Sequence, residues 1–402
     1  MQTPQPHLPA ALLENALRSP FHQRRIPAGA DFFSLPLLSK SDLAADQRLH
    51  PQLGSNLVRP ARDYTRISQT SGTTAAPLLV PDSPSNWEWM LENWMLGFHS
   101  LGVTAADRIF FAFSFGPFLG FWTAFEAANR LGATTYPAGG QSTAARLQNL
   151  ARFEASVLCC TPTYALHLAE TSRALALPPP PTLQRIIVAG EPGGLSESVH
   201  NRLANLWPNT RLLDHYGMTE VGPTAFLSPT SPNALHILPD RYLSEIVHPD
   251  SLIPVAPGET GELILTPLGR FDWPILRYRT GDLVRAPAPA EHGLLHGGIL
   301  GRTDDMVVVR GVNVYPSAIQ DVLAAFPEIV EHRMNVLHHG TLTELHLEIE
   351  PSPACANRPA LQRAAQSALY QSLSLRIEVT TTEPNSLPRF EMKAKRWTHH
   401  RK

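Results

Sequence analysis

Short apolar runs alternate with amphipathic segments over residues 108–206, and this alternation constrains the fold more than any other feature of the sequence. The apolar runs predict strands at Arg108–Phe113, Thr134–Tyr136, Val157–Cys160 and Arg185–Ala189. The segments between and after them predict helices over residues 119–131, 142–153, 162–175 and 196–206. Strands that alternate with helices in this way are typical of a largely parallel sheet. The sequence therefore predicts an α/β fold.

The regions on either side have different patterns. Before the alternation, residues 36–46 predict a turn that enters a helix, with Ser41 as a candidate N-cap, and residues 83–101 predict a helix. After residue 261, successive strands without long helices between them predict a β-rich subdomain. These strands are Glu262–Thr266, Ile275–Tyr278 and Leu283–Arg285.

A smaller α+β unit is predicted from residue 305 onward. Its strands are expected at Met306–Arg310, 333–337, Glu344–Glu350 and Arg376–Thr380, and its helices at Pro316–Phe326 and 358–373. The polar turn Gly301–Asp305 precedes this unit and suits a hinge. We therefore expect a large domain over residues 1–303 and a small mobile domain over residues 304–402.

The composition excludes several classes of protein. The 402 residues exceed what one ordinary core holds, and a net charge of −2 favours neither nucleic acid nor an anionic membrane. The cysteines, Cys159, Cys160 and Cys355, form no disulfide framework, and no apolar stretch is long enough to span a bilayer. The N-terminus lacks the pattern of a signal peptide. We expect a cytoplasmic protein with no nucleic-acid partner and no membrane insertion.

The segment Thr70–Pro77 combines hydroxyl side chains with one glycine directly after a strand-like run. The residues concerned are Thr70, Ser71, Gly72, Thr73 and Thr74. Backbone N–H groups and hydroxyls in such a loop bind the oxygens of a phosphate chain. An ordinary surface loop is the alternative, because clusters of this kind are common in loops.

Two further segments carry groups that suit a nucleotide. In Asp214–Glu220, Tyr216 suits stacking on a flat heterocycle, Thr219 suits a phosphate, and the Glu220 carboxylate suits Mg²⁺. The alternative is a turn at the end of a strand with a buried tyrosine. In Tyr278–Asp282, the Asp282 carboxylate is able to accept both hydroxyls of a ribose. The alternative there is an aspartate in a β-turn.

Taken together and in order, these segments resemble the adenylate-forming superfamily of acyl-CoA ligases, luciferases and peptide-synthetase adenylation domains. Within it the likeness is greatest to the phenylacetate–CoA ligase branch, and it extends over nearly the whole chain. The segments that carry it are Ser19–His22, Leu38–Leu43, Leu131–Thr134, Pro137–Gly140, Leu158–Leu166, Gly190–Pro192, Arg302–Met306 and Arg310–Val314.

The resemblance implies a reaction in two steps. A carboxylate first attacks the α-phosphate of ATP and gives an acyl-adenylate and pyrophosphate. A thiol, usually that of CoA, then displaces AMP after the C-terminal domain has rotated about a hinge. ATP, Mg²⁺ and CoA are therefore expected, together with a small carboxylic acid and, as an alternative acceptor, the thiol of an acyl carrier protein.

The resemblance also implies roles for individual residues. It places the β- and γ-phosphates at Thr70–Thr74, the adenine at Tyr216 and Asp214, and the ribose at Asp282 and Arg302, and it includes Glu191 among the residues that bind ATP or AMP. It implies that Thr219 contacts the α-phosphate, that Glu220 binds Mg²⁺, and that Lys393 stabilises the charge that develops during adenylation. Asp304 is the implied hinge and Gly311 lines the implied thiol tunnel.

The sequence departs from the family pattern at two places. The phosphate loop continues Ala75-Ala76-Pro77 instead of Gly-Lys-Pro, which removes a positive charge near pyrophosphate. Near the C-terminus, Glu391-Met392-Lys393-Ala394 stands for Glu-Gly-Lys-Ala. A solvated basic tail is the alternative interpretation of this second segment.

The acyl pocket is expected within residues 113–140 and 189–216. Its candidate wall consists of Phe115, Phe118, Phe121, Trp122, Tyr136 and Ala189. Such a wall suits an aromatic or medium-length apolar acid, although each ring also fits an ordinary core. The favoured function is an aryl- or arylacetyl-CoA ligase. The alternatives are an adenylating enzyme that loads a carrier protein and a nucleotide- or acyl-adenylate-binding protein with little turnover.

Overall fold

The computed structural model describes residues 8–70, 77–191, 194–195, 197–303, 305, 307–309, 312–339, 342–388 and 396–401. Its largest sheet has eight strands in the order β13-β9-β8-β7-β6-β5-β3-β4. These strands are β3 (Arg108–Phe111), β4 (Thr134–Pro137), β5 (Val157–Cys160), β6 (Arg185–Val188), β7 (Arg211–Met218), β8 (Gly222–Leu227), β9 (Ala234–Ile237) and β13 (Leu294–His296). Strands β4, β3, β5, β6 and β7 pair in parallel, whereas the pairs from β7 to β13 are antiparallel. The predicted α/β fold is confirmed, and the sheet is mixed.

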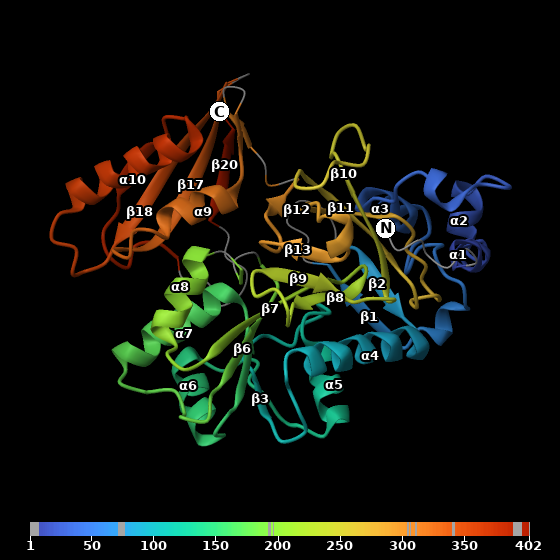
Figure 1. Ribbon diagram of the computed structural model, residues 1–402, viewed down its shortest axis with the longest axis horizontal. Coiled ribbons are helices and arrows are strands. Elements are labelled where there is room, and N and C mark those ends of the chain that lie inside the picture. The colour runs from blue at the N-terminus through green and yellow to red at the C-terminus, as the bar shows by residue number, and fades with distance from the viewer. Residues whose placement is uncertain are drawn as a thin grey trace.

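Helices cover both faces of this sheet (Figure 1). They are α4 (Pro84–Ser100), α5 (Trp122–Leu131), α6 (Thr143–Arg152), α7 (Pro162–Ala174) and α8 (Glu197–Leu206). Helices α4 and α5 contribute to one core with Phe111, whereas α6, α7 and α8 contribute to a second core with Phe110. Neighbouring residues of β3 enter different cores because successive side chains of a strand point to opposite faces.

Small antiparallel elements surround the central sheet. A hairpin of β1 (Arg66–Gln69) and β2 (Leu79–Asp82) precedes α4. A separate four-stranded sheet consists of β10 (Tyr242–Val247), β11 (Thr260–Pro267), β12 (Tyr278–Arg285) and β14 (Gly301–Arg302). The predicted break between the strands Ile275–Tyr278 and Leu283–Arg285 is wrong, because β12 continues through it. Gly281 has a φ of +76°, and the register against β11 shifts there, so the glycine forms an irregularity within the strand.

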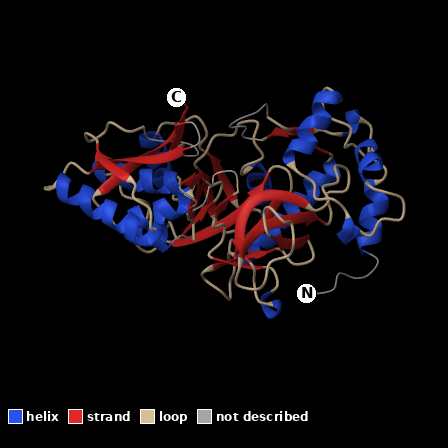
Figure 2. Cartoon of the chain, turned by 90° about the horizontal axis from the view of Figure 1, so that it is seen from above, coloured by secondary structure: helices blue, strands red, loops and turns tan. Residues whose placement is uncertain are grey.

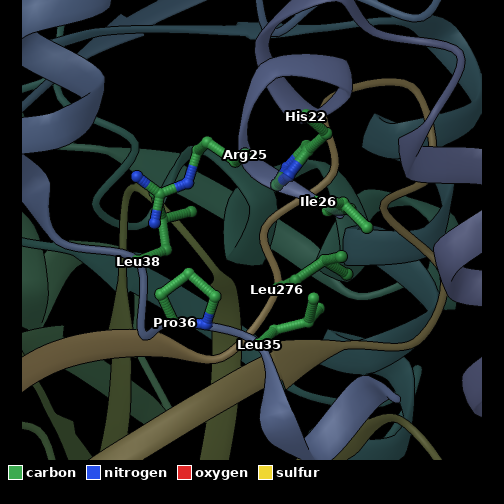
Figure 3. A pocket seen from close by; sticks show the side chains of 7 residues that line it. All are labelled: His22, Arg25, Ile26, Leu35, Pro36, Leu38 and Leu276. Atoms are coloured by element: carbon green, nitrogen blue, oxygen red, sulfur yellow. The ribbon is translucent and has the colours of Figure 1, made fainter. Parts of the chain in front are cut away.

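The N-terminal helices α1 (Leu8–Ala16), α2 (Pro20–Arg25) and α3 (Lys40–Leu49) pack near the four-stranded sheet (Figure 1). The predicted cap of α3 is wrong: Ser39 caps it in a capping box with Asp42, and Ser41 lies inside the helix. A cavity of about 10 Å³ lies beside His22. Figure 3 shows the mostly apolar side chains that line it. Burial lowers the pKa of His22 to about 4. A space of this size holds at most one water molecule, so it is a packing defect.

The C-terminal unit has a core of its own. It contains β15 (Val307–Val309), β16 (Val312–Val314), α9 (Pro316–Leu323), β17 (Ile329–His339), β18 (Leu342–Pro351), α10 (Arg358–Leu373), β19 (Glu378–Thr381) and β20 (Trp397–Arg401). Its sheet has the order β19-β18-β17-β20, and its core side chains all come from residues 307–397. Both views place this unit at one end of the molecule (Figure 1 and Figure 2). The sequence did not predict β20, which pairs in parallel with β17.

Within the described part of the chain, no helix combines the length and the apolarity that are needed to cross a bilayer.

Candidate active site

A cavity of about 210 Å³ lies between the central sheet, β12, β14 and helix α9. Its lining includes residues that the sequence predicted for the nucleotide: Glu191, Asp214, Tyr216, Asp282 and Arg302. It also includes Gln320 and Asp321 of α9, which belong to the C-terminal unit. The structure thus brings together in one space residues that are far apart in the sequence.

The cavity opens where the central sheet changes from parallel to antiparallel pairing. Strand β7 pairs in parallel with β6 as far as Asp214 and antiparallel with β8 from His215 onward. The segment Asp214–Met218 lies inside β7, so the alternative of a turn at the end of a strand is wrong for these residues.

The side chains of Tyr216 and Arg302 converge on the carboxylate of Asp282. The hydroxyl of Tyr216 donates to Oδ2 at 2.7 Å, and Nη1 of Arg302 donates to Oδ1 at 3.0 Å. Burial and the nearby Asp282 raise the pKa of Tyr216 well above its usual value, which keeps the hydroxyl protonated. Gly281 permits the irregularity before Asp282, since a side chain there would meet Arg302. The result is a fixed carboxylate beside a cation at the edge of the cavity.

Glu191 and Asp214 form another side of the cavity. The Oε1 atom of Glu191 accepts the backbone N–H of Thr163 at 2.7 Å and also the hydroxyl of that residue. Asp214 accepts the backbone N–H of His215 at 3.0 Å, and a Cβ atom at Gly194 would overlap its carboxyl group. Burial raises the pKa of Asp214 to about 7. This carboxyl group therefore keeps its proton to a higher pH than an exposed aspartate does.

The raised pKa of Asp214 predicts a pH dependence of stability. The folded state keeps this proton up to about pH 7, whereas the unfolded chain loses it near pH 3.8. The contribution of Asp214 to the free energy of unfolding therefore falls by about 1.4 kcal/mol per pH unit between these values and is lost above pH 7. We expect Asp214→Asn to gain stability relative to the wild type as the pH rises from 4 to 7.

Denaturant unfolding at several pH values measures this difference. The same substitution at the exposed residue Asp240 is the control and should produce no such slope. A constant difference between Asp214→Asn and the wild type from pH 4 to pH 8 would contradict the prediction.

Thr219 and Glu220 lie in the turn between β7 and β8. The Glu220 carboxylate is buried, accepts the hydroxyl of Tyr278 at 3.2 Å and lies 3.6 Å from Nζ of Lys40. Among the described residues, no three or more His, Cys, Asp or Glu side chains form a group that could hold a metal ion. One carboxylate fits Mg²⁺ nonetheless, because this ion is usually held by one or two carboxylates together with the phosphates of a substrate.

Of the other polar residues that were predicted for the site, Thr70 is the last described residue before a gap in the described part of the chain. Thr70 closes the base of its loop: its N–H donates to the carbonyl of Leu78, and its hydroxyl accepts the N–H of Leu78 at 3.1 Å. The remaining predictions lie outside the described residues. They are Ser71, Gly72, Thr73, Thr74, Asp304, Gly311 and Lys393.

The structure brings together some of the predicted acyl-pocket residues. The Phe115 ring centroid lies 4.7 Å from that of Trp122, and the Trp122 Nε1 donates to the carbonyl of Gly116 at 3.0 Å. Phe118 belongs to the same loop and is partly buried. Phe121 and Ala189 contribute to the core on this face of the sheet.

Tyr136 lies apart from this group. It is opposite Phe110 in the register of β3 and β4 and stacks on it at 4.9 Å, in the core on the other face. The alternation of side chains along the strand places it there.

The sequence did not point to Lys40, Arg270, Gln320 or Asp321. The first two contact Glu220, and the last two line the cavity. No local pattern distinguishes these residues, because each reaches the site from a distant element.

Known proteins show similarity to this chain over most of its length. A profile described as "AMP-binding enzyme" matches residues 31–267, and one described as "AMP-binding enzyme C-terminal domain" matches residues 311–401. The phenylacetate-coenzyme A ligase of Thermus thermophilus is 30% identical, covering 93% of this chain and 90% of that protein. The ligase of the same name from Escherichia coli is 30% identical, covering 93% and 89%.

Two solved structures of 2-hydroxyisobutyryl-CoA ligase differ in how well they superpose. In the postadenylation state with 2-HIB-AMP the TM-score is 0.90, with 26% identity over 98% of this chain and 89% of that one. In the thioesterification state with 2-HIB-AMP and CoA it is 0.69, with 27% identity over 99% and 91%. Because coverage is nearly equal, the difference reflects the arrangement of the parts. This chain has the arrangement closer to the postadenylation state.

Proposed function

The chain belongs to the AMP-binding enzyme family, and from this membership we propose that it activates a carboxylic acid with ATP and transfers the acyl group to the thiol of CoA. The observation that carries the proposal is the Asp282 carboxylate, held by Tyr216 and Arg302 at the edge of a cavity in the mixed sheet. A carboxylate fixed in this way is suited to accept the hydroxyls of a ribose.

In the first step, a carboxylate oxygen of the acid attacks the α-phosphorus of ATP, and the bond from this phosphorus to the bridging oxygen of pyrophosphate breaks. No general base is required, because a carboxylic acid is already ionised at neutral pH. Asp282 and Arg302 orient the ribose, Tyr216 packs against the adenine, and Thr219 contacts the α-phosphate. Lys393 stabilises the negative charge that develops around the phosphorus.

Mg²⁺ bound to the nucleotide phosphates would be held by Glu220 and would offset their charge. The chain's own contribution here is a buried carboxylate whose surroundings include Lys40 and the hydroxyl of Tyr278. This cation and this donor limit the negative potential of the Glu220 carboxylate until a metal–nucleotide complex binds.

In the second step, the sulfur of the CoA thiol attacks the acyl carbon and AMP leaves. The proposed hinge at Asp304 would let the small domain, residues 304–402, rotate away from the large domain, residues 1–303, between the steps, and the thiol would then enter past Gly311. The lower TM-score against the thioesterification state supports such a rotation. In the described arrangement, α9 of the small unit borders the nucleotide cavity.

We assign the acid to the aromatic or arylacetic class. The cluster of Phe113, Phe115, Phe121 and Trp122 supports this assignment. Its rings pack in tilted and edge-to-face pairs, and aromatic side chains of this kind suit a flat apolar group. The names of the relatives from Thermus thermophilus and Escherichia coli agree with it.

The test is a panel of acids incubated with ATP, Mg²⁺ and CoA, with product masses as the readout. Phenylacetate and benzoate represent the aromatic class, and 2-hydroxyisobutyrate and hexanoate are the comparison acids. We expect AMP, pyrophosphate and an acyl-CoA with an aromatic acid. Transfer to a phosphopantetheinylated carrier protein but not to CoA would identify the alternative acceptor. ATP binding without turnover of any acid would indicate a binding protein.

A further inference from the structure

Arg270 connects the β1–β2 hairpin to the turn that carries Thr219 and Glu220. It lies in the segment between β11 and β12, and its side chain and that of Asp82 are both fully buried. Nε and Nη2 of Arg270 donate to the two carboxylate oxygens of Asp82 at 2.9 and 2.8 Å. Nη1 donates to the carbonyl oxygens of Thr219 and Glu220 at 2.8 and 2.7 Å.

We propose that Arg270 is a positioning residue for the metal–nucleotide site, acting through the backbone of Thr219 and Glu220. The proposal rests on the function proposed above, in which Glu220 holds Mg²⁺ and Thr219 contacts the α-phosphate. Arg270 touches neither the nucleotide nor the metal. It determines which way the two carbonyl groups point and thereby the direction of the two side chains.

The chemistry of the contact explains why arginine is suited to this task. The guanidinium is planar and presents its N–H groups in fixed directions, so it binds a carboxylate on one edge and two carbonyls on another. A buried cation requires a partner of opposite charge, and Asp82 supplies it. The carbonyls of a buried turn also require donors, because unpaired backbone groups are strongly disfavoured away from water.

A second arginine makes the same set of contacts away from the site. Nε and Nη2 of Arg277 donate to the Glu245 carboxylate at 2.8 and 2.7 Å, and its Nη1 donates to the carbonyls of Phe33 and Leu35 at 2.5 and 2.6 Å. These carbonyls belong to the N-terminal segment. Arg277 is therefore a matched control, because its loss affects the fold in a similar way but does not touch the turn with Glu220.

The experiment compares Arg270→Lys with Arg277→Lys. Isothermal titration calorimetry measures ATP affinity with and without Mg²⁺, and thermal unfolding records the stability of each variant. Both variants should lose stability, since lysine cannot reproduce the planar fork. We expect the gain in ATP affinity that Mg²⁺ provides to fall about 10-fold in Arg270→Lys, the effect typical of residues that orient a metal ligand. That gain should stay as in the wild type in Arg277→Lys.

A second variant serves if Arg270→Lys does not fold. Asp82→Asn keeps the shape of the side chain at position 82 and binds the Arg270 guanidinium less strongly. It should therefore reduce the Mg²⁺-dependent gain in ATP affinity several-fold. The positioning role is overturned if a folded variant at position 270 or 82 keeps the wild-type gain in ATP affinity from Mg²⁺. It is also overturned if Arg277→Lys loses as much of that gain as Arg270→Lys does. If the wild-type protein binds ATP no better with Mg²⁺ than without it, the metal site of the proposed function is itself refuted. This outcome is seen before any variant is compared.

Discussion

Asp282→Ala is expected to weaken ATP binding by about 100-fold. The substitution removes the carboxylate that accepts Tyr216 and Arg302 and that we assign to the ribose hydroxyls. Hydrogen bonds to a charged group contribute about 1.5–3 kcal/mol each, and the loss of one or two corresponds to a factor of this size. Isothermal titration calorimetry with ATP measures the effect directly.

Deoxynucleotides separate a ribose contact from a general disturbance of the cavity. The wild type should bind 2′-deoxy-ATP and 3′-deoxy-ATP more weakly than ATP, whereas Asp282→Ala should bind all three nearly equally, because its contact is already lost. Asp282→Asn keeps one acceptor oxygen, so its ATP affinity should lie between those of the wild type and Asp282→Ala. If Asp282→Ala binds ATP like the wild type, or still distinguishes the deoxynucleotides, the ribose lies elsewhere.

Lys393→Ala should reduce the adenylation step by about 100- to 1000-fold and leave the second step nearly unchanged. The proposed role of this lysine is to stabilise charge at the α-phosphate, and losing one such preorganised group typically has an effect of this order. Pyrophosphate release measures the first step. Acyl-CoA formation from a supplied acyl-adenylate measures the second step without the first.

Lys395→Ala is the matched control for this prediction. Lys395 lies two residues further along the same basic segment, carries the same charge and has no assigned role in the chemistry. It should retain adenylation within about two-fold, because no step of the proposed chemistry uses it. An equal loss in both half-reactions of Lys393→Ala would exclude the assigned role. A larger adenylation defect in Lys395→Ala would transfer the role to that residue.

A comparison of the predicted and observed helices and strands shows which features local sequence patterns determine. The strand Val157–Cys160 and the helix 358–373 were predicted with the bounds that the structure has, and most other elements agree within a few residues. No prediction covered the strands β8, β9, β10, β13 and β20. Ser39 caps α3 instead of Ser41, and β20 pairs in parallel with β17.

In the candidate site, too, some features depend on a short segment and others on contacts between distant segments. The residue types suited to a nucleotide were recognisable in short segments, because a tyrosine, a glycine turn and a carboxylate each have local chemistry. Their meeting in one cavity was not. Tyr216 reaches Asp282 across 66 positions, and Arg270 reaches Asp82 across 188. The separation of Tyr136 from Trp122 follows from the register of β3 and β4.

The sequence by itself determined the α/β class, the alternation of strands and helices over residues 108–206 and the chemical identity of the candidate groups. Strand and helix periodicity, capping and turn residues act over a few positions, so they can be read without coordinates. The tertiary structure alone decided which groups meet: the Asp282 cluster, the Arg270 contact with the Glu220 turn, and the approach of α9 to the cavity. Such contacts depend on how distant segments pack together, and no local repeat in the chain records that packing.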